Sequence, residues 1–161
     1  MKIILASKSG VRKQILDKYK IDNEVILSNV DEDEVKVSLL SEGASPLSIS
    51  KNLAEIKSIK VSNKNPDRLV LGADSVISLN EELINKPSSR EEALNILKKL
   101  NNLKHNLISS VCISKNGSMI WNYTDISELK MKNLTENQLK TYLDKIDTKT
   151  LLAYGVYQIE A

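Results

Sequence analysis

The chain has 161 residues, of which 41% are hydrophobic and 27% are charged, proportions typical of a single globular domain. A net charge of +2 and an aromatic content of 4% argue against a nucleic-acid-binding surface. No apolar run approaches the length of a membrane span, and the single cysteine, Cys112, permits no internal disulfide. We therefore expect a cytoplasmic protein with neither a nucleic-acid nor a membrane partner.

The chain opens with a short apolar strand, Ile3 to Ala6, followed by a small-residue turn and a helix. Ser7, Ser9 and Gly10 make up the turn, and Arg12 lies in the first turn of the helix. Backbone N–H groups and the helix dipole favour an anion at such a position, and a guanidinium suits phosphate. The turn is therefore either a phosphate site or an ordinary strand-to-helix connection with a solvated arginine.

A second short strand is predicted at residues 24–27, and four consecutive acids, Asp31 to Glu34, follow it. Runs of like charge of this kind are usually solvated loops. Carboxylate oxygens are also the ligands that hard divalent cations prefer. Both interpretations stay open on the residues alone, and the spacing favours the loop.

The next predicted element is a helix that begins with Ser45-Pro46 and ends near Val61. Lys57 lies one turn after the apolar Leu53, so its side chain borders the buried face of this helix. Most lysines in such a position extend their ammonium group to solvent, and a minority reach a ligand.

The strongest predicted strand begins after Arg68 and contains Gly72-Ala73 directly before Asp74. An acid behind two small residues near the end of an apolar run is the most conspicuous carboxylate of the chain. In α/β folds, ligands bind beyond the carboxyl ends of strands. Asp74 therefore either faces a ligand or merely caps a turn with Ser75.

The second half of the chain predicts a tight hairpin near Asn80, then a helix over residues 89–100 and a long hairpin around Asn116-Gly117. Lys86 stands just before this helix, where an exposed loop lysine is the commoner case. The only histidine, His105, has no partner at metal-ligand spacing and is not a candidate base. Early alternation of strands and helices with a late hairpin predicts an α/β fold with a mixed, twisted sheet.

These signals occur in a recognisable order. The opening LASKSGVRKQIL resembles the LASxSPxRRxxLL start of the Maf family of nucleotide pyrophosphatases. Similar segments follow in the family's order, at residues 30–32, 53–57, 71–75, 86–87 and 155–160. The likeness covers essentially the whole chain, and six weak motifs in the right order are specific together.

The resemblance implies the Maf/ITPase-like fold, an elongated mixed sheet with flanking helices and a central cleft between two lobes. It implies hydrolysis of nucleoside triphosphates, often modified ones, to the monophosphate and pyrophosphate with a divalent metal, Mg²⁺ or Mn²⁺. The family is linked to cleansing of nucleotide pools and to cell-division arrest.

The resemblance also implies roles for individual residues. The phosphate-binding residues would be Ser7, Ser9, Arg12 and Lys13. The catalytic residues would be Asp74 as general base, with Lys57 and Lys86 neutralising the triphosphate. The metal ligands would be Glu32 and Asp74. The residues that tune the choice of base would be Val11, Ser75 and Glu160.

The sequence departs from the family at Gly10, where proline is usual, and at Val11, which matches neither subgroup. It ends at Ala161, where members normally continue through a further strand pair. We therefore expect a single, shortened Maf-like domain over residues 1–161, either weakly active or stabilised as a homodimer. The alternative function is a nucleotide-binding regulator of septum formation that cleaves its ligand poorly.

Overall fold

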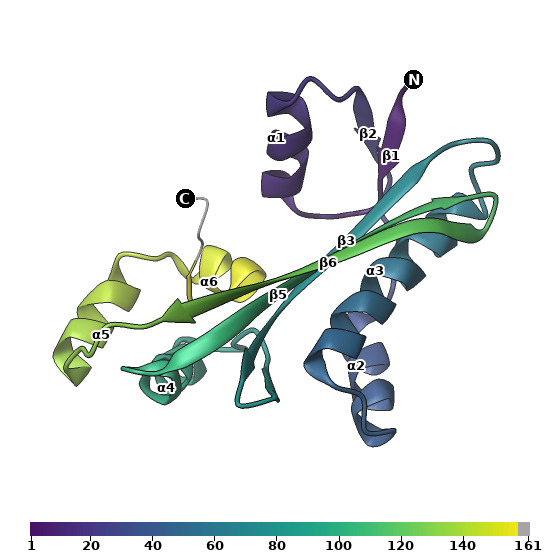
Figure 1. Ribbon diagram of the computed structural model, residues 1–161. Helices are drawn as coiled ribbons and strands as arrows, with labels where there is room; N and C mark the ends of the chain where they lie inside the picture. The colour runs from purple at the N-terminus through teal and green to yellow at the C-terminus, as the bar shows by residue number, and fades with distance from the viewer. Residues whose placement is uncertain (158–161) are drawn as a thin grey trace. The chain divides into compact units, whose positions relative to one another are not determined.

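Strands and helices alternate through the first half of the chain, and a long hairpin and further helices follow (Figure 1). The structure is a computed structural model that describes residues 1–157. In this part of the chain the elements are β1 (Ile3–Leu5), α1 (Gly10–Lys18), β2 (Asn23–Val25), α2 (Glu32–Ser41), α3 (Pro46–Ser62), β3 (Val70–Leu79), β4 (Glu82–Ile84), α4 (Arg90–Leu100), β5 (Lys104–Lys115), β6 (Ser118–Lys130), α5 (Glu136–Asp144) and α6 (Thr148–Tyr154).

Within the described residues the strands form a six-stranded mixed sheet. Its order is β2-β1-β3-β5-β6, with β4 paired to β3 beside this path. β1 is parallel to both β2 and β3, whereas β4 is antiparallel to β3. Helical connections join the parallel strands, as crossovers require. The predicted α/β fold with a mixed sheet is confirmed.

Two compact units divide the chain, and β3, β5 and β6 contribute residues to both. The first unit comprises Met1–Val76 and Ile108–Ile126, and the second comprises Ile77–Leu107 with the chain from Ser127 onward. The predicted cleft between two lobes and the predicted single domain over residues 1–161 stay predictions.

In the first unit α3 lies close against one face of the sheet (Figure 1). Gly72 of β3 permits this approach, since a Cβ at that position would lie 2.3 Å from the carbonyl oxygen of Ala54 and 2.8 Å from the amide nitrogen of Ser58. The other sheet-facing positions of α3 include small residues as well, Ser50 among them. Helix and sheet therefore meet along a seam of short side chains.

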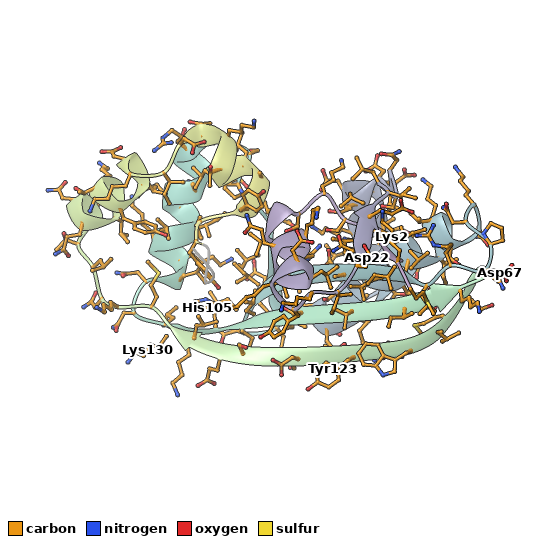
Figure 2. All side chains as sticks on the ribbon, turned by 90° about the horizontal axis from the view of Figure 1, so that it is seen from above. Lys2, Asp22, Asp67, His105, Tyr123 and Lys130 are labelled. Atoms are coloured by element: carbon orange, nitrogen blue, oxygen red, sulfur yellow. The ribbon has the colours of Figure 1, made fainter. Side chains whose placement is uncertain are left out.

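In the second unit helices α4, α5 and α6 enclose a hydrocarbon core. Its buried members are Leu79, Ala93, Leu97, Leu100, Leu139, Leu143, Leu151 and Val156. Two of these helices have capped starts, because Ser89 caps α4 and Thr135 forms a capping box with Gln138 at the start of α5. His105, at the start of β5 (Figure 2), is buried and bonds to the Tyr157 hydroxyl at 2.9 Å.

The acidic run differs from the predicted loop. Asp31 is the N-cap of α2, and its side chain accepts a hydrogen bond from the backbone N–H of Glu34 at 3.0 Å. Glu32, Asp33 and Glu34 occupy the first turn, where negative charge complements the helix dipole. The like charges therefore stabilise a helix start here. Every helix in residues 1–157 is too short or too polar to cross a membrane.

Candidate functional site

The loop after β1 is held together by its own hydroxyl groups. Ser9 caps α1, and its side chain accepts a hydrogen bond from the backbone N–H of Arg12 at 3.4 Å. The Ser7 hydroxyl oxygen accepts from the Ser9 N–H at 3.2 Å and from Arg12 Nη1 at 2.9 Å. Ser7, Ser9 and Arg12, which suggested an anion site, thus form a hydrogen-bonded turn in which the Arg12 guanidinium is held by Ser7.

Arg12 also connects this loop to β3. Its Nη1 donates to the main-chain oxygen of Ala73 at 3.0 Å, one residue before Asp74. Parallel pairing explains the proximity, because Leu5 is in register with Leu71, so β1 ends beside the part of β3 that leads to Asp74. Asp74 lies in the middle of β3 and not beyond its carboxyl end, because the strand continues to Leu79. The loop and the conspicuous carboxylate are therefore parts of one region.

Three charged side chains from three elements meet next to this loop and form the Lys57 cluster, which consists of Lys57, Asp74 and Glu32. Lys57 Nζ, from α3, lies 3.1 Å from Asp74 Oδ1 on β3 and 2.8 Å from Glu32 Oε1 at the start of α2. Lys57 is 5% exposed and Asp74 6%, whereas the Glu32 side chain is 38% exposed. The lysine therefore does not extend to solvent, as most helix-border lysines do, and its charge is shared between two carboxylates.

Burial raises the pKa of Asp74 above its ordinary value, and the carboxylate of Glu32 adds to the rise. The positive charges of Lys57 and Arg12 act in the opposite direction and only partly offset the loss of hydration. Among the described residues, Asp74 Oδ2 is buried and has no hydrogen-bond partner. A carboxylate with a raised pKa and an unused oxygen is suited to accept a proton or to meet a cation.

A family model described as "Maf-like protein" matches residues 2–161. The chain belongs to the Maf family.

Relatives of this Maf chain are named as pyrophosphatases that act on nucleotides. It is 61% identical over 158 residues to a nucleoside triphosphate pyrophosphatase of Pelagibacter ubique (strain HTCC1062), covering 98% of this chain and 81% of that protein. It is 33% identical over 160 residues to a 7-methyl-GTP pyrophosphatase of Brucella abortus biovar 1 (strain 9-941), covering 99% and 80%.

A solved structure supports the fold. A HAM1 protein from Coxiella burnetii is similar with a TM-score of 0.52 at 14% identity, covering 81% of this chain and 72% of that one. At this identity the likeness concerns the fold alone.

Three further predicted site residues of this Maf chain lie in the first unit, Val11 and Lys13 on α1 and Ser75 on β3. Lys13 pairs with Asp17 on the exposed side of α1 at 2.7 Å, and Val11 is half-buried. Ser75 is exposed, and its hydroxyl lies 3.1 Å from that of Ser109. The roles expected for these residues stay predictions.

Two further predicted site residues are not placed against this region. Lys86 lies in the second unit, between β4 and α4, so its expected contact with the triphosphate stays a prediction. Glu160, expected to tune the choice of base, lies outside the described residues.

The residues of this region fit a divalent metal. Glu32 and Asp74 supply carboxylate oxygens, and the buried, unpartnered Oδ2 of Asp74 is an atom that a cation would satisfy. Within residues 1–157 there is no group of three or more acidic, histidine or cysteine side chains that could hold a metal. Two carboxylates suffice for Mg²⁺, which usually completes its shell with water and substrate phosphates.

Sequence reasoning missed Ser50, a fully buried residue of α3 whose hydroxyl donates to the main-chain oxygen of Asp74 at 3.2 Å. A signal was present, because Ser50, Ala54 and Ser58 recur every four residues and so line one face of the helix. Short side chains at this spacing indicate close packing, yet they do not say which backbone atom lies opposite.

Proposed function

We propose that this Maf chain hydrolyses nucleoside triphosphates, modified ones among them, to the nucleoside monophosphate and pyrophosphate. Its family and the names of its relatives make it a hydrolase of the acid-anhydride class. The observation that carries the proposal is the buried Lys57, which joins Asp74 and Glu32 beside the Arg12 loop. Phosphoryl transfer needs positioned cations and a base that activates water more than it needs covalent chemistry. Arg12 and Lys57 are cations in this region, and Asp74 is a candidate base.

In the proposed reaction a water molecule attacks the α-phosphorus, and the bond from that phosphorus to the bridging oxygen breaks. Pyrophosphate leaves with the bonding electrons, and the proton of the attacking water passes to the Asp74 carboxylate. The raised pKa of Asp74 supports this role, since a base gains driving force as its pKa approaches the working pH. Arg12 and Lys57 would neutralise charge on the phosphate oxygens, and Ser7 would hold the arginine in place.

A divalent metal, Mg²⁺ or Mn²⁺, would be held by Glu32 and Asp74. When bound it would neutralise phosphate charge and polarise the phosphoryl oxygens. Lys57 already places one positive charge between these carboxylates, so the protein arranges a cation there from its own side chains.

The proposed choice of base depends on Val11, Ser75 and Glu160. The Ser75 hydroxyl is exposed and paired with Ser109, so it is available as a donor or an acceptor toward a polar group. The 7-methyl-GTP pyrophosphatase among the relatives supports including a methylated guanine nucleotide among the candidates. A cytoplasmic location, a homodimer and a link to septum formation stay predictions.

The experiment that tests the proposal measures pyrophosphate release from canonical and modified nucleoside triphosphates with Mg²⁺ or Mn²⁺. The matched control is Asp74→Asn, which keeps the shape of the side chain and removes its charge. We expect release that is lost in the variant while circular dichroism and the melting transition show a folded protein. Full activity in Asp74→Asn would refute the assignment of the base. A folded wild type that binds nucleotide without cleaving it would support the regulatory alternative.

A further inference from the structure

A chain of three hydroxyl groups, of which Ser50 and Ser110 are buried, leads through the first unit to the main chain of Asp74. The Thr124 and Ser110 hydroxyl oxygens lie 3.0 Å apart, and Ser110 and Ser50 are also 3.0 Å apart. Ser50 in turn lies 3.2 Å from the main-chain oxygen of Asp74. Ser50 is 0% exposed and Ser110 is 1% exposed, so water does not compete for these groups.

The Ser50 hydroxyl has one hydrogen and two acceptors within reach. It is the donor toward the main-chain oxygen of Asp74, which can only accept, and toward the Ser110 hydroxyl oxygen. Either hydroxyl can donate in the bond between Ser110 and Thr124. The three hydroxyl groups therefore form one hydrogen-bonded network that ends at the Asp74 main chain.

The two ends of Asp74 are held by the same helix. Ser50 contacts its main-chain oxygen, and Lys57, seven residues later on α3, contacts its carboxylate at 3.1 Å. Residues seven apart lie on one face of a helix, two turns from each other. Gly72 brings the same helix close to β3 at Ala54 and Ser58. The helix therefore fixes both the backbone and the charged end of one residue.

We propose that Ser50, Ser110 and Thr124 are positioning residues that hold Asp74 in its working orientation through its main-chain oxygen. The proposal rests on the function proposed above for the kinetic role of Asp74. The anchoring itself is a property of the folded protein and is measured without substrate. Loss of the Ser50 hydroxyl removes this contact with the Asp74 main-chain oxygen and lets the residue shift. The Asp74 carboxylate then loses its alignment with Lys57.

The chain contains a matched control on the same helix. Ser58 is also 0% exposed and also pairs with a serine of β5, since its hydroxyl lies 2.7 Å from that of Ser114. Ser58 also donates to the Glu55 main-chain oxygen at 3.0 Å. Ser50→Ala and Ser58→Ala therefore remove the same group from equally buried sites, and only the first removes a contact with Asp74.

The direct measurement uses the fact that Asp74-Ser75 is the only Asp-Ser dipeptide in the sequence. Protein labelled with ¹³C-carbonyl aspartate and ¹⁵N-serine gives one carbonyl–nitrogen correlation peak, which reports the Asp74 carbonyl. We expect Ser50→Ala to move this peak and Ser58→Ala to leave it in place. An unmoved peak in Ser50→Ala would overturn the anchoring.

The kinetic measurement separates positioning from stability. Ser50→Ala is expected to lower kcat by about tenfold with little change in KM, because a small misplacement of a reacting group is costly. Ser58→Ala should lower the melting temperature by a similar amount and leave kcat unchanged. Equal loss of kcat in both variants, or no loss in Ser50→Ala, would contradict the positioning role and leave the hydroxyl groups with a role in packing alone.

A second pair of variants covers the case in which Ser50→Ala does not fold. Thr124 is half-buried, so Thr124→Val removes the hydroxyl at the start of the network with little change of volume and Thr124→Ser keeps it. We expect a smaller loss of kcat in Thr124→Val and recovery in Thr124→Ser; equal activity in the two would count against the proposal. If the wild type releases no pyrophosphate, the proposed function fails, and the carbonyl peak alone decides the anchoring.

Discussion

The seam between α3 and the sheet in the first unit and the core of the second unit differ in composition. The seam buries Ser50, Ser58, Lys57, Asp74 and Ser110, whereas the core of the second unit is formed by leucine, alanine and valine. Hydrocarbon burial stabilises without regard to direction, while buried hydroxyl and charged groups are favourable only in one arrangement. The polar contact between α3 and the sheet therefore gives up some stability for a defined geometry, and the core of the second unit contributes stability with little demand on geometry.

The largest expected effect on stability is in the hydrocarbon core. Leu97 is 1% exposed, and Leu97→Ala should lower the free energy of unfolding by about 2–5 kcal/mol through lost burial and a residual cavity. Chemical denaturation measures the loss. If the two regions differ as described, kcat of this variant stays at the wild-type value at temperatures where the protein is folded. A reduced kcat under those conditions would show that the core also shapes the site.

The same kind of change in the seam should affect both properties. Gly72→Ala places a Cβ 2.3 Å from the Ala54 carbonyl oxygen, so α3 must move away from β3. We expect a loss of about 1–3 kcal/mol and a lower kcat, because Lys57 moves with the helix. Gly10→Ala is the control, since its Cβ would meet nothing within 4 Å and its stability should be unchanged or higher. Wild-type kcat in Gly72→Ala would contradict the tight coupling of helix and site.

The burial of the Asp74 carboxylate should make the free energy of unfolding depend on pH. The pKa of Asp74 is raised by burial, so the folded state holds its proton more tightly than the unfolded state. Stability is then lost as pH rises from the ordinary value of 3.8 through the raised one. Asp74→Asn should therefore be more stable than wild type at neutral pH, on the order of 1 kcal/mol, and equal to it in acid. Denaturation curves at several pH values would contradict this if the variant were less stable throughout.

The smallest effect concerns the second unit. Burial lowers the pKa of His105 below its ordinary 6.5, so the unfolded state binds the proton first as the solution is acidified. The stability contributed by keeping His105 neutral is present above about pH 6.5 and is lost as pH falls toward the lowered value. His105→Gln should flatten this acid-side slope by less than about 1 kcal/mol. An unchanged slope between pH 7 and 5 would assign it to other groups.

Much of the fold was predictable because its signals are local. The apolar run after Arg68 predicted the strand that carries Asp74, and Asn116-Gly117 predicted the turn between β5 and β6. The helix after Asp31 was missed, because four acids suggest solvation until the first-turn dipole is taken into account. A strand can be predicted from the alternation of apolar and polar residues, but a run of acidic residues shows no such periodic pattern even where it begins a helix.

The candidate site was predictable as a set of residue types and not as an arrangement. Lys57 was expected near an apolar face, yet its bonds to Glu32 and Asp74 depend on how three separate elements pack. The hydroxyl of Ser50 gave no chemical signal, because serine is common in helices that face small neighbours. Contacts between distant segments are fixed by tertiary packing, which one sequence does not display.

The spacing of Ser50 and Lys57 on α3 has a consequence for changes of chain length. Each residue added to or removed from a helix turns everything beyond it by about 100°. A single insertion or deletion between these residues would leave both side chains intact and separate the two contacts with Asp74. Loops such as that before α3 can change length with little cost, whereas this seven-residue interval has to keep its count. The site is thus sensitive to a change of chain length within this interval of α3.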